Sequence, residues 1–247
     1  MAKRCKKKQQ EIIKKDNPDW VVDYFRNNHN DLYSSSYKYF VSSYESKIYN
    51  KFLSEVPDNS IIVDVSIRDG SSLLTEENSY LIYRKRLQIF CYEKDEKFVQ
   101  EVKKKIDDYK IGYNVFIFNK DIVNQDIIFS QKANYLYING ILGIINNFNE
   151  FITEAIKKFN PVNIIISNAL EEKEYIVRSF MKPKLKYLTF GVDFGRVVTR
   201  EELEKNIEEC KLKIISKDIS YHAHTLGIWA DIWFYVLEQQ KRIVRKF

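Results

Sequence analysis

Five short apolar runs, separated by longer stretches with helical periodicity, set the strongest limit on the fold of this chain. They occupy residues 61–65, 88–92, 114–118, 134–138 and 162–166. Each run is continuous rather than alternating, which is typical of strands that are buried on both faces of a parallel sheet. The stretches between the runs are long enough for crossover helices. This alternation predicts an α/β fold with a doubly wound, mostly parallel, Rossmann-like sheet.

Helical periodicity is clear both within and ahead of the expected sheet. In residues 148–159 the apolar side chains fall on one stripe of a helix. Residues 16–56 form a second helical region, in which apolar side chains recur at three- and four-residue steps. Its stripe consists of Tyr37, Phe40, Val41, Tyr44, Ile48 and Phe52. We therefore expect N-terminal helices before the first strand.

The end of the sequence predicts a helix followed by a β-hairpin. Thr199 and Glu202 have the spacing of a capping box, which favours a helix start at this point. Two β-like runs follow at residues 212–219 and 228–237, and the gap between them is too short for a helix. These runs are therefore expected to be antiparallel neighbours that close the sheet, joined by a loop that contains two histidines.

Positive charge is concentrated at the N-terminus. Residues 1–15 carry seven Lys or Arg and one Glu, a net charge of +6 that equals the formal charge of the whole chain. The rest of the chain is charge-balanced, so no broad basic surface for a polyanion is expected. Contact with nucleic acid is predicted only through this tail, and a solvated N-terminus is the alternative. The chain divides into a basic flexible tail at 1–15, a helical segment at 16–56 and a Rossmann-like domain at 57–247.

Cysteine usage and hydropathy bear on the setting of the protein. Cys5, Cys91 and Cys210 are far apart and odd in number, which indicates neither a disulfide framework nor a zinc site. No apolar run approaches the ~18 residues of a membrane-spanning helix. Residues 1–15 lack the apolar core of an export signal. We expect a cytoplasmic protein without a transmembrane segment.

Candidate binding residues follow from the expected sheet, because ligands of open α/β folds sit at the carboxyl ends of the strands. The first strand leads into Asp64, Ser66, Arg68 and Gly70, and the second strand ends at Glu93. An acidic side chain at such a point can accept two hydrogen bonds from a ribose diol. A surface glutamate at a strand end is the equal alternative. Glu93 lies 29 residues beyond Asp64, more than the ~20 of a dinucleotide fingerprint, so a long first crossover helix is expected.

This order of features resembles the class I S-adenosylmethionine-dependent methyltransferase superfamily, over residues 44–240. In that family the first strand leads into an Asp-x-Gly-x-Gly-x-Gly loop, of which Asp64 and Gly70 are kept here. Ser66 and Arg68 stand at the other two glycine positions. Ser66 is small enough to substitute for glycine. Arg68 departs from the family pattern, and we expect its guanidinium to pair with the methionine carboxylate of the cofactor.

The resemblance also assigns roles at the ends of the third and fourth strands. It implies that Asp121 bonds the adenine amino group, and that Asn139 and Gly140 border the methyl-donor sulfur. For Asp121 the alternative is a turn former between Asn119 and Asn124. For the other pair it is an ordinary Asn-Gly turn.

His222 and His224 are the candidate catalytic residues. Two positions apart, they lie on one face of an extended segment. An imidazole suits the removal of a proton from a hydroxyl acceptor near neutral pH. The resemblance makes the last strand the reversed one, which places the histidine loop at the same edge of the sheet as Gly70 and Glu93. Structural histidines are the alternative, and no third ligand is paired with them to form a metal site.

The absence of other motifs narrows the function. There is no Gly-Lys-Ser/Thr phosphate loop and no Gly-x-Ser-x-Gly elbow, so P-loop and α/β-hydrolase chemistry are excluded. The resemblance therefore implies an S-adenosylmethionine-dependent methyltransferase acting on a small molecule or a sugar. The alternatives are a methyltransferase-like scaffold without catalysis, favoured by Arg68, and an RNA-binding or RNA-modifying protein, favoured by the basic tail. A nicotinamide-dependent enzyme is a third alternative, because an acid after the second strand also suits NAD.

Overall fold

The computed structural model describes residues 38–142, 145, 147–170, 198–225 and 228–240. Helices and strands alternate along this part of the chain. The helices and strands, in order, are α3 (Lys38–Glu55), β1 (Ile61–Asp64), α4 (Glu76–Arg84), β2 (Gln88–Glu93), α5 (Glu96–Asp108), β3 (Val115–Asn119), β4 (Tyr135–Asn139), α6 (Phe148–Phe159), β5 (Asn163–Leu170), α8 (Arg200–Glu209), β6 (Leu212–Thr225) and β7 (Ile228–Gln239).

The strands form one seven-stranded sheet in the order β3-β2-β1-β4-β5-β7-β6. Strands β1 to β5 are mutually parallel, and β7 runs antiparallel to both β5 and β6. The predicted α/β fold is confirmed, including the closing hairpin with the last strand reversed. The strand order changes direction between β1 and β4, so their carboxyl ends flank the crevice where ligands of such sheets bind.

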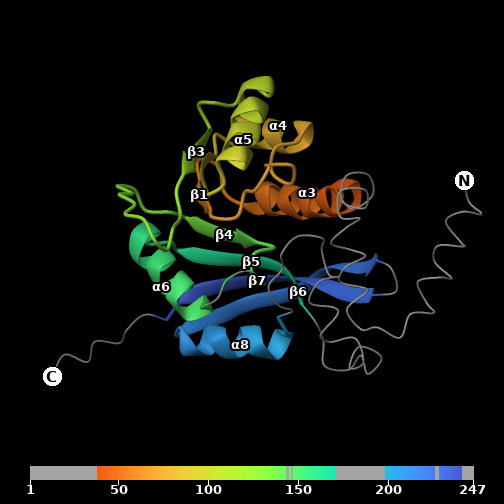
Figure 1. Cartoon of the computed structure of the whole chain (residues 1–247), viewed down its shortest axis with the longest axis vertical. Coiled ribbons are helices and arrows are strands. Elements are labelled where there is room, and N and C mark those ends of the chain that lie inside the picture. The colour runs from red at the N-terminus through yellow and green to blue at the C-terminus, as the bar shows by residue number, and fades with distance from the viewer. Residues whose placement is uncertain (1–37, 143–144, 146, 171–197, 226–227, 241–247) are drawn as a thin grey trace, which may run out of the picture.

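Helices cover both faces of the sheet (Figure 1). Helices α3, α4 and α5 pack on one face, with Leu53, Ile82 and Val102 among their buried side chains. Helices α6 and α8 pack on the other face, where Phe151 and Leu203 are buried. The second half of α3, which belongs to the predicted N-terminal helical segment, therefore shares a core with the sheet.

Local signals in the sequence explain where several helices begin. The Thr199 side chain accepts a hydrogen bond from the Glu202 N–H at 3.1 Å, as the capping box predicts. Asp95 and Asn147 cap α5 and α6 in the same way. Lys85 is buried and donates from Nζ to two carbonyls at the end of α3, which supplies acceptors that the helix itself leaves unpaired.

Two predictions about length are wrong. The first crossover is long because of the loop at residues 65–75, since α4 has only 9 residues. His222 and His224 lie within β6 rather than in a loop, because β6 continues to Thr225 and pairs with β7 past two register shifts. The connection between β6 and β7 still falls at the carboxyl edge of the parallel strands, since β7 is the reversed strand.

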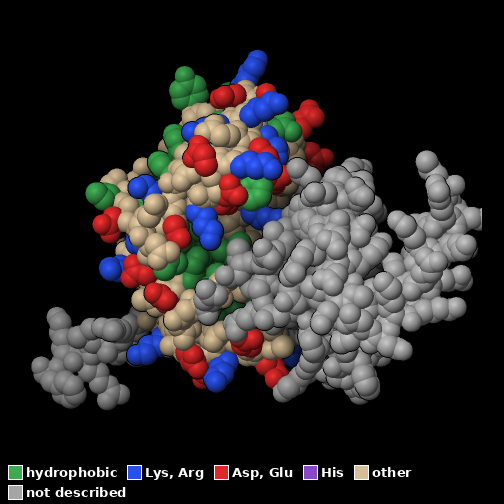
Figure 2. All heavy atoms as spheres, in the orientation of Figure 1, with side chains coloured by type: hydrophobic (Ala, Val, Ile, Leu, Met, Phe, Trp, Pro, Cys, Tyr) green, Lys and Arg blue, Asp and Glu red, His purple; other side chains and the backbone are tan. Residues whose placement is uncertain are grey.

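The described surface carries charges of both signs. In the face drawn in Figure 2, Lys and Arg side chains are interspersed with Asp and Glu. Within the described ranges, no helix is both long and apolar enough to span a bilayer. Residues 1–37, which include Tyr37 and the basic tail at 1–15, lie outside the described residues. The boundary between the tail and the helical segment at residue 16 therefore stays a prediction.

Candidate binding site at the carboxyl ends of β1, β2 and β4

Asp64, the last residue of β1, is buried and fully engaged with its neighbours. Its Oδ2 accepts a hydrogen bond from Tyr49 Oη of α3 at 2.5 Å. Its Oδ1 accepts from the Ser66 N–H at 2.7 Å and from Ser66 Oγ at 3.2 Å. Burial raises the pKa of Asp64 to about 6, and the bonds from Tyr49 and Ser66 oppose that rise. The carboxylate therefore fixes the loop after β1 and the helix above it.

Ser66 connects the first loop to β4. Its hydroxyl accepts a hydrogen bond from the Asn139 N–H at 2.7 Å while it contacts Asp64. A glycine at this position has no group with which to make these bonds. The loop is thus closed by side-chain bonds where the family pattern has bare backbone.

The loop keeps glycine-like backbone geometry at Arg68. Both Arg68 and Gly70 have positive φ, at 51° and 73°, which is unfavourable for a residue with a Cβ. A Cβ at Gly70 would lie 3.1 Å from side-chain carbons of Leu74 and Val102. Gly70 is therefore required by packing as well as by its dihedral angles.

Glu93 holds two backbone segments together. Its Oε2 accepts the Arg68 N–H at 3.2 Å, and its Oε1 accepts the Asp95 N–H at 2.9 Å. The side chain is only partly buried. A carboxylate offers about four acceptor positions, so these two bonds leave capacity for a ligand. Glu93 is thus anchored by two backbone amides at the end of β2.

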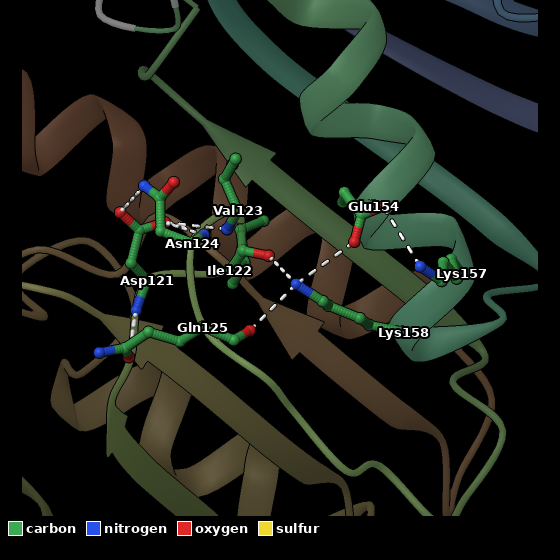
Figure 3. Close-up of polar contacts among 8 residues, drawn as sticks. All are labelled: Asp121, Ile122, Val123, Asn124, Gln125, Glu154, Lys157 and Lys158. Atoms are coloured by element: carbon green, nitrogen blue, oxygen red, sulfur yellow. Dashed lines mark hydrogen bonds and ion pairs between the residues drawn. The ribbon is translucent and has the colours of Figure 1, made fainter.

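Asp121 forms a turn, the alternative that the sequence offers to a contact with adenine (Figure 3). Its carboxylate accepts from the Val123 N–H at 2.8 Å and from Asn124 Nδ2 at 2.9 Å. Partial burial raises the pKa of Asp121, but these hydrogen bonds outweigh it and the net pKa is lowered. Lys158 of α6 fixes the same loop by donating to the carbonyls of Ile122 and Gln125.

Asn139 and Gly140 continue the edge of β4 rather than forming a hairpin turn. The Gly140 N–H donates to the Ser167 carbonyl of β5 at 2.9 Å, with φ at 67°. Glu45 of α3 hydrogen-bonds the Asn139 side chain. A Cβ at Gly140 would lie 3.5 Å from Glu45 Oε1, so this carboxylate stands directly beside the glycine.

Glu45 was not anticipated from the sequence. Burial raises its pKa to about 7, Arg68 lowers it, and Asp69 and Asp64 raise it further. The available signal is its spacing, because position 45 lies between Val41 and Ile48 on the apolar stripe of α3. An acidic side chain on a buried stripe is unusual unless it is paired or functional.

The structure brings most of the predicted residues together and separates the histidines from them. Asp64, Ser66 and Asn139 form one chain of hydrogen bonds, and Arg68 and Glu93 another. The backbones of the two histidines lie in β6, with β7 and β5 between them and β4. Their side chains lie outside the described part of the structure. Among the described residues no group of His, Cys, Asp and Glu is arranged to hold a metal ion.

Comparisons with known proteins identify the fold. No protein-family model and no curated protein matches the sequence. A geranyl diphosphate C-methyltransferase from Streptomyces coelicolor, solved with S-adenosylhomocysteine, superposes with TM-score 0.60 at 9% identity, covering 80% of this chain and 78% of that one. An S-adenosylmethionine-dependent methyltransferase from Aquifex aeolicus superposes with TM-score 0.55 at 13% identity, covering 91% and 100%. The [4+2]-cyclase SpnF gives TM-score 0.59 at 11% identity, covering 78% and 80%.

These likenesses define the class of fold to which the chain belongs. It has the class I S-adenosylmethionine-dependent methyltransferase fold, with the strand order and reversed last strand described above. Identities of this size establish the fold and leave the reaction to be argued from the site.

Proposed function

We propose that this protein binds S-adenosylmethionine and transfers its methyl group to a small molecule or a sugar. The observation that carries the proposal is the position of Glu93, at the end of β2 and hydrogen-bonded to the loop after β1. In this fold that position faces the crevice between β1 and β4. A carboxylate held there by two backbone amides is oriented to receive a ribose diol.

The other residues at the crevice fit the charge and shape of this cofactor. Arg68 supplies a cation for the methionine carboxylate. Gly140 has no side chain and a positive φ, which leaves its backbone open to close approach. Asp121 would contact the adenine amino group, since its Oδ2 accepts only one hydrogen bond from the described residues. The cofactor supplies a methyl group on a sulfonium, and the protein contributes binding and orientation.

Titration calorimetry with S-adenosylhomocysteine, run beside NAD, tests the proposal. We expect S-adenosylhomocysteine to bind and NAD to bind far more weakly. Glu93→Ala should weaken binding by ~1.5–3 kcal/mol, the range for a hydrogen bond to a charged group. Glu55→Ala is the matched control, because Glu55 is an exposed glutamate at the last position of α3. Tighter binding of NAD, or unchanged affinity in Glu93→Ala, would contradict the proposal.

A scaffold without catalysis is the second candidate. It is favoured by the way Asp64 and Ser66 use their polar atoms within the protein rather than leaving them toward the crevice. SpnF shows that this fold also occurs in a protein named for another reaction. The scaffold predicts no measurable binding of either S-adenosylhomocysteine or S-adenosylmethionine, so the same titration separates the two candidates.

A further inference from the structure

A cluster of polar side chains lies between α3 and the carboxyl half of β4 and β5. Asp64 pairs in register with Tyr137, and Asn139 pairs with Ser167 two residues closer to the carboxyl edge. Glu45 lies one helical turn before Tyr49 on α3 and hydrogen-bonds Asn139. We call Glu45, Tyr137, Asn139 and Ser167 the acceptor cluster.

Two members of the acceptor cluster, Tyr137 and Ser167, have buried hydroxyl groups without a well-aligned hydrogen bond. Tyr137 and Ser167 are 0% and 1% exposed. Neither hydroxyl makes a well-aligned hydrogen bond to another described residue, although Ser167 lowers the pKa of Tyr137 as a hydrogen-bond partner. The negative charges of Asp64 and Glu45 both raise the pKa of Tyr137. Buried hydroxyls left unpaired are costly and call for a partner.

We propose that the acceptor cluster binds a small primary or secondary amine, and that Glu45 receives its ammonium group and removes one proton from it. This inference rests on the proposed function and narrows its substrate class. Glu45 stands beside Gly140, the residue proposed to border the methyl donor, and is partly exposed. An amine entering from this side meets the Glu45 carboxylate, and the buried hydroxyls of Tyr137 and Ser167 belong to the interior of the same cluster.

Charge around Glu45 favours a cation over an anion. The charged groups that act on it are Arg68 and Asp69 from the loop after β1, and Asp64 from β1. Tyr137 of β4 is the other titratable group that faces it. Lys105 pairs with Asp69 across 3.9 Å, so Glu45 and Asp64 are the two carboxylates that stand against the Arg68 guanidinium. A phosphate-bearing acceptor would meet net repulsion here, whereas an ammonium would be attracted.

The reaction balances with Glu45 as the proton acceptor. The ammonium group gives one proton to the Glu45 carboxylate, which frees the nitrogen lone pair. The nitrogen then forms a bond to the methyl carbon as the bond from that carbon to sulfur breaks. The products are the methylated ammonium ion and neutral S-adenosylhomocysteine, and the proton leaves Glu45 for solvent. Burial holds the pKa of Glu45 at about 7, which suits a base that works near neutral pH.

Matched pairs of amines and alcohols test the proposal. Full-length protein saturated with S-adenosylhomocysteine is titrated with benzylamine and benzyl alcohol, butylamine and butanol, and ethanolamine and ethylene glycol, and binding is followed by ligand-observed NMR. In at least one pair the amine should bind about tenfold tighter or more. Glu45→Gln should abolish that preference, and Glu55→Gln, on the exposed side of the same helix, should retain it.

The outcomes separate this inference from the proposed function. If S-adenosylhomocysteine fails to bind, the proposed function itself is wrong. If it binds and no pair shows a preference for the amine, or Glu45→Gln keeps the preference, only the amine site is overturned.

The unpaired hydroxyls provide a second readout. Tyr137→Phe and Ser167→Ala should leave the melting temperature of the free protein unchanged or raised, because each removes a buried group that has no partner. Both should weaken binding of the preferred amine several-fold. A marked fall in melting temperature with unchanged amine binding would show that the hydroxyls serve the fold, and would count against the proposal.

Discussion

Tyr49 of α3 donates a hydrogen bond to Asp64 of β1 over 2.5 Å, across 15 positions of sequence. Both side chains are almost completely buried, at 1% exposure each. The bond joins helix α3, on one face of the sheet, to the last residue of β1. Because Ser66 carries the same connection on to Asn139, the helix, the first loop and β4 are held by one continuous polar chain.

Tyr49→Phe should destabilise the protein by ~1.5–3 kcal/mol at neutral pH, since it removes a hydrogen bond to a buried charged group. Urea unfolding measures this change. Tyr137→Phe is the matched control, because it removes a buried phenol hydroxyl from the same face of the sheet that has no partner there. Equal effects of the two variants would show that the bond to Asp64 does not stabilise the fold.

Protein stability should fall as pH rises through the range where Glu45 and Asp64 ionise. Burial is the main cause that raises the pKa of Glu45 from 4.5 to about 7 and the pKa of Asp64 from 3.8 to about 6. Between each pair of values the folded state holds a proton that the unfolded state has released, so stability decreases with increasing pH. Their contribution is complete below about pH 4 and is lost by about pH 7.

Glu45→Gln should flatten the upper part of this dependence, and urea midpoints measured from pH 4.5 to 8 would reveal it. The expected result is a variant that gains stability over the natural protein as the pH rises. Glu55→Gln should follow the natural curve, because Glu55 is exposed. A Glu45→Gln curve parallel to the natural one would contradict the raised pKa.

Arg68→Gly should stabilise the folded protein and weaken cofactor binding. Arg68 has a φ of 51°, where glycine is favoured over other residues by ~1 kcal/mol. Lys110→Gly is the control, since Lys110 has a φ of 56° on an exposed turn after α5. Lys110→Gly should gain stability in thermal unfolding, and Arg68→Gly should gain less, because it also removes the attraction between Arg68 and Glu45. Only Arg68→Gly should lose affinity for S-adenosylhomocysteine, and unchanged affinity would remove Arg68 from the proposed carboxylate contact.

Gly70→Ala should destabilise the protein by ~1–3 kcal/mol, because the added Cβ enters a well-packed core at a positive φ. The Cβ would stand 3.1 Å from carbons of Leu74 and Val102. Gly112→Ala provides the comparison, since there the nearest carbon, on Ile106, would be 3.7 Å away. Denaturant unfolding of both variants checks the difference, and a Gly70→Ala protein as stable as Gly112→Ala would disprove the packing argument.

The strands and several helices could be predicted from the sequence because their signals are local. The continuous apolar run at 134–138 became β4 with a shift of one residue, and the stripe at 148–159 became α6. The capping box placed the start of α8. These features depend on periodicity and on capping side chains a few residues away, and the chain itself displays both.

The side-chain partners in the site could not be predicted in the same way. No local pattern marks Tyr49 as a hydrogen-bond donor to the site, because its bond to Asp64 exists only where α3 lies across the end of β1. Asp121 shows the reverse case, in which a residue given a cofactor role by resemblance also has a local role in its own turn. The histidines were assigned to a loop because no sequence signal shows that β6 continues past its second register shift to Thr225.

Through its hydrogen bonds to two backbone amides, the Glu93 side chain connects segments that are far apart in sequence. One amide belongs to Arg68, in the loop after β1, and the other to Asp95, the residue that caps α5. Release of the carboxylate would free both at once, so the loop and the first turn of α5 should open as a single unit. Their backbone protons should therefore exchange with deuterated solvent at a common rate, and a ligand on Glu93 should slow both together.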